Sequence, residues 1–171
     1  MKHHLVYYGH EKLRQNAEPV TEFDSDLVSL SEAMFKIMKK YNGIGLAAPQ
    51  IALSKKFVTI DLTSYDKEKL VIVNPEIVWR SEKKGPYDEG CLSIPGIFET
   101  VDRPIEVVVN AYNLDGKQIE IKADDILARV LQHEIDHLNG IMFVDHLEEY
   151  IRKEYTKELK KIKKMNKQAL F

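Results

Sequence analysis

The segment His133-Glu134-Ile135-Asp136-His137 carries the side chains best suited to chemistry in this sequence. Within a helix, residues four apart lie on one face, so the two imidazoles can reach a single cation. Glu134 leans toward the same space, where its carboxylate can hold a water molecule rather than the metal. The alternative is a solvated helix with two incidental histidines. We therefore expect His133 and His137 to ligate a metal used for hydrolysis, with Glu134 as acid and base.

A third ligand is needed, because two histidines leave a tetrahedral catalytic site one protein ligand short. In the metzincin pattern the third histidine would stand at position 143, which is Phe143 here, so that pattern is excluded. His146 is a spare histidine further on. Glutamates in a following helix are a second option, and four are available: Glu148, Glu149, Glu154 and Glu158. Spacing alone leaves these options open.

Cys91, the single cysteine, is the upstream candidate for this ligand. It cannot form an intramolecular disulfide, so it is a buried thiol, a ligand or a nucleophile. Gly90 precedes it and Pro95 follows soon after, which suits a backbone that approaches another group closely. A thiolate ligand would favour Fe²⁺, Zn²⁺, Co²⁺ or Ni²⁺ over Mg²⁺ or Ca²⁺.

Helices at the two ends of the chain must help to position these residues. Apolar residues at helical spacing, with a cap at Asp24 or Ser25, predict a helix over 24–41. The motif helix should run from Asp124 or Asp125 to about Asn139. A last amphipathic helix starts near Asp145, and its apolar stripe is Leu147, Ile151, Tyr155, Leu159 and Ile162.

Strands occupy the middle of the sequence. Runs rich in β-branched residues predict strands over 56–62, over 70–73 with an extension over 77–79, within 101–112 and over 118–122. Asn113-Leu114-Asp115-Gly116 forms a hairpin turn between the last two. This order predicts an α+β fold: central short antiparallel strands, the metal-binding helix and a C-terminal amphipathic helix.

Length and composition indicate one soluble domain spanning residues 1–171. The net charge of -2 argues against wholesale coating of nucleic acid. No apolar run approaches the roughly 20 residues that span a bilayer. The N-terminus lacks the apolar region of a signal peptide, so we expect a cytoplasmic, monomeric protein without a membrane partner.

Three segments, in this order, resemble the signature motifs of the peptide deformylases: Gly43-Ile44-Gly45-Leu46-Ala47-Ala48-Pro49-Gln50, Glu89-Gly90-Cys91-Leu92-Ser93 and Gln132-His133-Glu134-Ile135-Asp136-His137. The resemblance implies an enzyme that removes the formyl group from N-formylmethionine at the start of newly made proteins and releases formate. It implies Cys91, His133 and His137 as ligands of one divalent ion. That ion is Fe²⁺ in the cell, with Zn²⁺, Ni²⁺ or Co²⁺ also able to occupy the site.

The same resemblance assigns the other roles. Glu134 carries protons, while the Gln50 amide and the Leu92 backbone N–H stabilise negative charge on the formyl oxygen. An apolar pocket takes the methionine side chain. The candidates for substrate binding are Ile44, Gly45, Tyr87, Glu89, Gly90, Ile126 and Val130. Ordinary core packing is the alternative for Ile126 and Val130.

Residues behind and beside the site are also expected to matter. Glu89 and Asp136, with Arg103 as a counterion, should hold the ligands in place. Arg129 should form a structural salt bridge with an acidic neighbour, and contact with peptide carbonyls is the alternative. Many bacterial relatives carry a Gln-Arg pair where this chain has Ile97-Phe98, so the edge of the site should be more apolar here.

The C-terminal segment from about Leu147 is distinctly basic, with eight Lys or Arg and four Glu. It is expected to pack its apolar stripe on the body with the lysines outward. A second hypothesis is contact with ribosomal RNA through Lys160, Lys161, Lys163, Lys164 and Lys167.

Two other functions are compatible with the motifs: a zinc endopeptidase using a downstream glutamate, and a non-catalytic metal- or peptide-binding protein.

Overall fold

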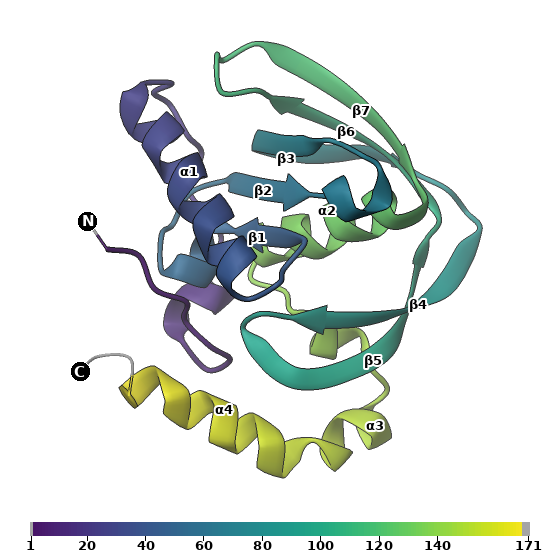
Figure 1. Cartoon of the computed structure of the whole chain (residues 1–171). Helices are drawn as coiled ribbons and strands as arrows, with labels where there is room; N and C mark the ends of the chain where they lie inside the picture. The colour runs from purple at the N-terminus through teal and green to yellow at the C-terminus, as the bar shows by residue number, and fades with distance from the viewer. Residues whose placement is uncertain (1, 169–171) are drawn as a thin grey trace.

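The computed structural model describes residues 2–168, and it contains a five-stranded antiparallel sheet in the order β1-β2-β3-β6-β7 (Figure 1). The strands of this sheet are β1 Gly45–Ala47, β2 Phe57–Asp61, β3 Lys69–Arg80, β6 Glu106–Tyr112 and β7 Gln118–Asp124. A second, two-stranded antiparallel sheet is formed by β4 (Lys84–Cys91) and β5 (Ile94–Pro104). The predicted α+β class with antiparallel strands is confirmed.

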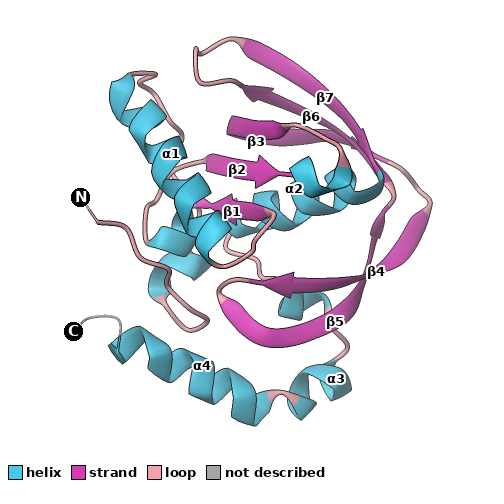
Figure 2. Ribbon diagram, viewed as in Figure 1, coloured by secondary structure: helices cyan, strands magenta, loops and turns pink. Residues whose placement is uncertain are grey.

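Helix α2 (Asp125–Leu138) lies between the large sheet and the β4–β5 pair (Figures 1 and 2). Its Leu131, Ile135 and Leu138 pack in one core cluster with residues of β2 and β6 such as Ile60 and Val109. The polar face of the helix is therefore left to face β4. The helix ends as predicted at Asn139.

Helix α1 (Ser25–Lys40) covers β1 and β2 from another side. The Asp24 side chain caps it by accepting a hydrogen bond from the Leu27 N–H at 3.2 Å, as the sequence predicted. Buried Met34 and Met38 lie on its inner face. The helix delivers Tyr41 and the following turn to the end of the sheet where β1 begins.

The C-terminal segment is not one helix, which corrects the prediction of a continuous helix from Asp145. A 3-10 turn at Phe143–His146 precedes α3 (Glu149–Glu154) and α4 (Thr156–Gln168). The break falls at Tyr155, whose hydroxyl donates a 2.5 Å hydrogen bond to Glu99 on β5. Leu159 and Ile162 of α4 are buried beside β5, so the expected apolar stripe does pack on the body.

The strand predictions need further correction. The strand expected within 101–112 is β6, whereas β1, β4 and most of β5 were not expected. Gly85, Pro86 and Gly90 are poor strand formers, so β4 lacks the local pattern from which a strand is predicted. Among the described helices, none is long and apolar enough to cross a membrane.

Candidate metal centre

Cys91, His133 and His137 meet where the end of β4 passes the polar face of α2. Their ligand atoms all lie within 4.8 Å of one another, and Cys91 Sγ is 3.3 Å from His137 Nε2. Within residues 2–168 this is the one group of three potential metal ligands. The predicted set of one upstream cysteine and two helical histidines is thus close enough to share a cation.

The downstream alternatives do not join this group. The side chains of Glu148, Glu149, Glu154 and Glu158 are exposed. His146 pairs instead with Asp136 at 2.8 Å, with its Nε2 turned toward the carboxylate. The four glutamates therefore lie on the surface, and His146 lies at the periphery of the site, bound to Asp136.

Two buried polar atoms at the centre indicate that the site is built to bind something. Glu134 Oε2 and His137 Nδ1 have no hydrogen-bond partner among the described residues. Buried polar groups without a partner are rare in proteins and point to an ion, a water or a ligand. The thiol, the two imidazoles and this carboxylate together fit a divalent transition-metal ion.

The charges around the two histidines differ. Burial, together with the positive charge of His133, lowers the pKa of His137 well below 6.5, so this imidazole is neutral and free to ligate. Burial also acts to lower the pKa of His133, but hydrogen bonds with Cys91 and Glu89 raise it well above 6.5. His133 therefore stands where positive charge is stabilised, and a metal cation can take the place of that proton.

A chain of buried ionic contacts holds His133 from behind. The Glu89 carboxylate is 2.9 Å from His133 Nδ1 and accepts two hydrogen bonds from Arg103, at 2.6 and 3.0 Å. Arg103 also donates to Asp136 at 2.8 Å. Burial would raise the pKa of Glu89, but the hydrogen bonds from His133 and Arg103 lower it to about 2. The carboxylate is thus ionised and its orientation fixed.

Arg129 forms the expected salt bridge only at long range, and its shorter contacts are with backbone groups. It donates hydrogen bonds to the backbone carbonyls of Val101, at 2.9 Å, and Gly85. Glu89 is a more distant ionic partner at 3.9 Å. Arg129 therefore ties α2 to β4 and β5 mainly through backbone groups.

Glu134 is 4 % exposed and lies beside the ligands, with its Oε1 4.0 Å from His133 Nε2. Burial raises its pKa to about 7. Gly45 of β1 makes room for this carboxylate, because a Cβ at Gly45 would stand 2.6 Å from Glu134 Oε1. Residue 45 in the first motif is therefore a glycine because the backbone of β1 passes close to Glu134 on α2.

Gln50 lies in a 3-10 turn (Ala48–Ile51) and is almost fully buried. Its Oε1 accepts a hydrogen bond from the Ala47 N–H at 2.9 Å. This bond orients the amide so that Nε2 points toward Ser93 Oγ, at 3.2 Å, and Cys91 Sγ, at 3.4 Å. Leu92 lies in the turn between β4 and β5, next to Cys91. Both expected donors therefore lie beside the candidate metal centre.

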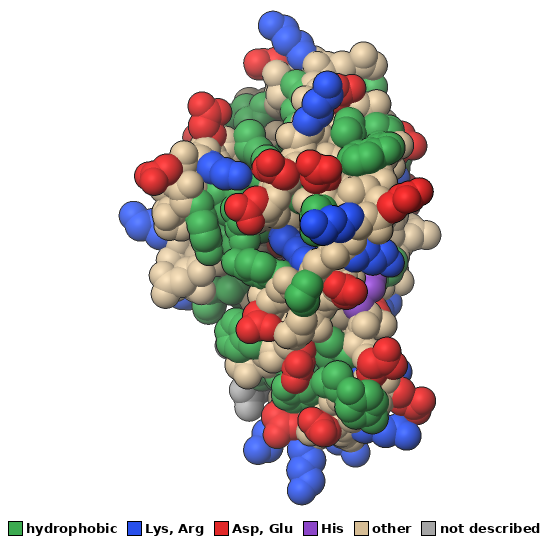
Figure 3. All heavy atoms as spheres, turned by 90° about the vertical axis from the view of Figure 1, so that its right-hand side faces the viewer, with side chains coloured by type: hydrophobic (Ala, Val, Ile, Leu, Met, Phe, Trp, Pro, Cys, Tyr) green, Lys and Arg blue, Asp and Glu red, His purple; other side chains and the backbone are tan. Residues whose placement is uncertain are grey.

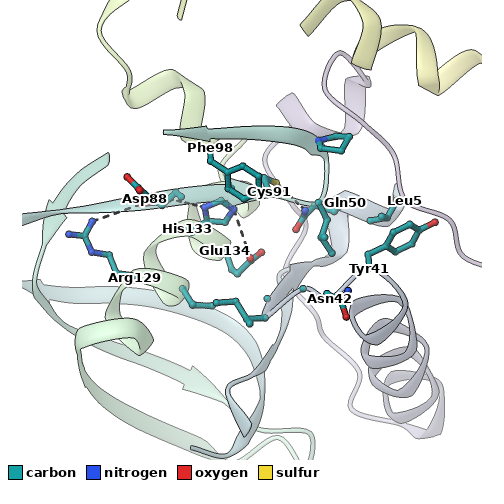
Figure 4. Close-up of a pocket in the computed structure, with 18 of the residues that line it drawn as sticks. Leu5, Tyr41, Asn42, Gln50, Asp88, Cys91, Phe98, Arg129, His133 and Glu134 are labelled. Carbon is teal, nitrogen blue, oxygen red and sulfur yellow. Dashed lines mark hydrogen bonds and ion pairs between the residues drawn. The ribbon is translucent and has the colours of Figure 1, made fainter. Parts of the chain in front are cut away.

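A cavity of about 570 Å³ opens over this centre (Figure 4). Every residue expected to bind substrate lines it: Ile44, Gly45, Tyr87, Glu89, Gly90, Ile126 and Val130. Cys91, His133 and Glu134 line the cavity, and fully buried His137 completes the ligand group without lining it; we call these four residues the floor. We call the half-exposed to exposed side chains of Tyr41, Tyr87, Phe98 and Met165 the rim. Tyr87, expected as a wall of the methionine pocket, is 41 % exposed and belongs to the rim.

Several residues that line the cavity were not predicted from the sequence, among them Leu5, Tyr41, Asn42 and Met165. They come from the N-terminal segment, the end of α1 and α4. The Asn166 side chain joins two of these regions by bonding the backbone N–H and C=O of Tyr7, at 2.8 and 2.9 Å. No local pattern marks such residues, because only the tertiary packing of the two ends of the chain brings them to the cavity.

An α+β fold with a Cys/His/His cluster beside a buried glutamate is the arrangement expected of a metal-dependent hydrolase. The sequence model of the polypeptide deformylase family matches residues 2–153. The chain therefore belongs to the peptide deformylase family. Members of this family remove the formyl group from the N-terminus of nascent peptides, and this chain is a hydrolase of that kind.

Individual relatives agree over nearly the whole chain. A peptide deformylase of Hydrogenovibrio crunogenus is 43% identical over 160 residues, which cover 94% of this chain and 92% of that protein. One of Brachyspira hyodysenteriae is 39% identical over 168 residues, covering 95% and 90%. The crystal structure of a peptide deformylase from Legionella pneumophila matches with a TM-score of 0.89 at 43% identity, covering 99% of this chain and 98% of that one. The predicted family is confirmed.

Proposed function

We propose that Cys91, His133 and His137 hold one Fe²⁺ ion and that Glu134 moves the proton when the formyl group is removed from N-formylmethionyl peptides. The observation that carries this proposal is the convergence of the three ligand atoms within 4.8 Å beside the buried, unpartnered carboxylate oxygen of Glu134. One thiolate and two imidazoles suit Fe²⁺, Zn²⁺, Co²⁺ and Ni²⁺, and the family resemblance favours Fe²⁺. When bound, the cation polarises the formyl carbonyl and makes water more acidic.

Glu134 is the group that holds and transfers the proton. Its carboxylate accepts a proton from the attacking water as the new C–O bond forms. The same proton then goes to the amine nitrogen as the C–N bond of the formamide breaks, which leaves formate and a free N-terminus. Burial raises the pKa of Glu134 to about 7, and a neighbouring cation favours its ionised form. Both proton acceptance and proton return are then accessible near neutral pH.

Gln50 and Leu92 stabilise the negative charge that develops on the formyl oxygen. The bond from the Ala47 N–H fixes the Gln50 amide before substrate arrives, so little reorganisation is needed during the reaction. Leu92 contributes its backbone N–H from the turn that follows Cys91. In this proposal the end of β4 and its turn supply one ligand, Cys91, and one donor, Leu92, while Gln50 comes from the 3-10 turn after β1.

The methionine side chain occupies the inner part of the cavity. Ile126 and Val130, each 6 % exposed, line it from α2, and Ile44 lines it from the loop before β1. Gly45 and Gly90 also line the cavity, and their lack of a side chain makes room for Glu134 and for the Phe98 ring. An unbranched thioether fits such an apolar space without requiring a polar partner.

The test is formate release from formyl-Met-Ala-Ser compared with peptidase activity on unblocked Met-Ala-Ser. We expect formate from the first peptide and no cleavage of the second. Cys91→Ser should lower metal content and formate release together, while Ser93→Ala, two residues away and outside the ligand group, should retain the metal. Full metal content and activity in Cys91→Ser would remove the thiolate from the proposal.

We further propose a monomeric, cytoplasmic enzyme in which residues 1–171 form one catalytic domain; Met1 and residues 169–171 lie outside the described residues. The burial of Leu159 and Ile162 supports α4 as part of that domain. On the face shown in Figure 3, acidic and basic side chains are interspersed, and this mixture extends to the lower end, where α3 and α4 lie.

The basic helix α4 is proposed to contact ribosomal RNA. Lys160, Lys161 and Lys164 are exposed while the apolar face of α4 is buried, so the charges are available to phosphate. Changing all three to Glu should weaken ribosome co-sedimentation without unfolding the protein. The matched control changes three exposed lysines elsewhere, Lys67, Lys83 and Lys84. Equal co-sedimentation of both triple variants would reject the contact.

A further inference from the structure

Phe98 is a large apolar side chain left in solvent at the mouth of the cavity. It is 68 % exposed, although it lines the same cavity as the floor. Its neighbour Ile97 is 2 % exposed and packs in the core, so strand alternation turns only Phe98 outward. Figure 4 shows the Phe98 side chain pointing from its strand into the cavity that Cys91 and His133 also line.

The Phe98 ring rests on the backbone of Gly90. A Cβ at Gly90 would overlap the ring edge, so the ring can lie there only because residue 90 has no side chain. Gly96, which lines the same cavity two residues earlier on β5, also has open space around it, because a Cβ there would meet nothing within 4 Å. One edge of the Phe98 ring is therefore supported by the Gly90 backbone, while most of the side chain stays exposed and available for contact with another side chain.

The cavity deepens from this ring toward α2. Ile126 and Val130 are 6 % exposed at the inner end, whereas Phe98 and Tyr41 are 68 % and 42 % exposed at the mouth. A peptide that places its formyl group over the floor and its first side chain in the inner end must carry its second residue toward the mouth. That second residue then passes the rim.

Apart from Glu134 on the floor, the charged side chains that line the cavity are engaged by other groups of the protein. Asp88 accepts a 2.6 Å hydrogen bond from Thr100, and Glu89 is held by Arg103 and His133. Arg129 is engaged by backbone carbonyls. The rim therefore offers apolar surface rather than free charge to the second residue of the substrate.

We propose that Phe98 is a specificity-determining residue that favours substrates with a large apolar side chain directly after formylmethionine. This inference rests on the proposed function, because it uses the same placement of the formyl group and the methionine. The Phe98 ring loses exposed apolar surface when an apolar side chain packs on it, and a polar or small side chain gives less of that gain. The preference should amount to about tenfold in kcat/KM, typical of added apolar contact in an enzyme pocket.

The experiment compares formyl-Met-Leu-Ser with formyl-Met-Ser-Ser in formate release. The unaltered protein should prefer the leucine peptide. Phe98→Ala should lose most of that preference through a higher KM for the leucine peptide. Phe98→Leu should restore much of the preference. The kcat of both peptides and the KM of the serine peptide should change less than about twofold, because Phe98 does not touch the reacting atoms. Tyr150→Ala is the matched control, since Tyr150 is also 68 % exposed but does not line the cavity.

Three outcomes would overturn the proposal. One is an unchanged leucine preference in Phe98→Ala, and another is an equal loss for both peptides, which would indicate a purely structural role. A thermal melt of each variant shows whether an equal loss for both peptides comes instead from partial unfolding. Absence of formate from either peptide with the unaltered, metal-loaded protein would overturn the proposed function, and this inference with it.

Discussion

The floor of the cavity buries polar groups that are connected to one another, whereas the rim exposes apolar groups with few partners. On the floor, His133 is held by Glu89, which is held by Arg103. On the rim, Phe98 rests on a glycine backbone and Met165 arrives from the far end of the chain. Proton transfer and metal ligation require fixed atoms, while contact with varied peptides tolerates exposed and adaptable ones. Changes on the floor should therefore reduce turnover, and changes on the rim should alter recognition.

The largest effect is expected at Glu134. Glu134→Gln keeps the size of the side chain but removes the proton acceptor, so kcat should fall by about 10²–10⁴ while metal content stays unchanged. Formate release and metal analysis on the same sample measure both. Glu120→Gln, at an exposed position on β7, is the control. If Glu134→Gln retained full turnover, Glu134 would have no part in the proton transfer.

A smaller loss should follow from crowding the floor. In Gly45→Ala the new Cβ would stand 2.6 Å from Glu134 Oε1 and 2.9 Å from Val130 Cγ1, so the carboxylate must move. Misplacement of a catalytic group by about 1 Å can reduce the rate about 10²-fold. Gly85→Ala is the comparison, because its Cβ would meet one methyl group of Ile105 at 3.1 Å. Equal kcat in the two alanine variants would contradict the steric argument.

Breaking the support behind His133 should affect metal binding and stability together. Glu89→Gln leaves Arg103 buried with less negative charge beside it, so the free energy of unfolding should fall by about 3 kcal/mol. Metal affinity should fall about 10–100-fold, as for other groups that orient a ligand. Denaturant unfolding and metal titration measure the two losses, with Glu76→Gln on the exposed side of β3 as control. Metal affinity equal to that of the control would show that Glu89 does not orient His133.

The same carboxylate predicts a pH dependence of stability. The hydrogen bonds from His133 and Arg103 lower the pKa of Glu89 from 4.5 to about 2 in the folded state, despite the opposing effect of burial. A lowered pKa stabilises the folded state above pH 4.5, and this contribution is lost as the pH falls from there to about 2. The difference in unfolding free energy between the unaltered protein and Glu89→Gln should therefore shrink over that range. A difference independent of pH would mean that the ionised carboxylate is not its source.

The smallest effect is expected from removing the Asn166 hydrogen bonds that hold α4 against the N-terminal segment beside the rim. Asn166→Ala removes the hydrogen bonds from α4 to Tyr7, which should cost about 1 kcal/mol of stability. Met165 lies next to it on the rim, so KM should rise modestly while kcat stays constant. Lys167→Ala, at the following exposed position, is the control. A loss of kcat in Asn166→Ala would mean that the rim and the floor are not separable.

The sequence predicted the floor better than the rim, for a physical reason. His133, Glu134 and His137 share one helix, so their spacing predicts their juxtaposition. Cys91 lies outside that helix, and spacing left it open against several glutamates until the resemblance to a family favoured it. The rim residues Tyr41 and Met165 come from distant elements, and nothing local in the sequence brings them together.

The fold shows the same limit. Helices α1 and α2 were predicted with nearly correct bounds because an aspartate precedes an apolar period in each, although only Asp24 forms the expected cap hydrogen bond and Asp124 does not. Strand β4 was missed because glycine and proline interrupt its pattern, although it carries Glu89 and Cys91. The break at Tyr155 was missed because a contact with Glu99 on β5, rather than a helix-breaking residue, accompanies it.

The central claim is that a metal held by Cys91, His133 and His137 is required to remove the formyl group. The most direct measurement follows formate release from a formylmethionyl peptide by anaerobically purified protein, before chelation, after chelation and after Fe²⁺ is returned. The account predicts about one metal ion per chain at the start, loss of formate release with the metal, and recovery in proportion to the Fe²⁺ that is rebound. Undiminished formate release from metal-free protein would contradict it.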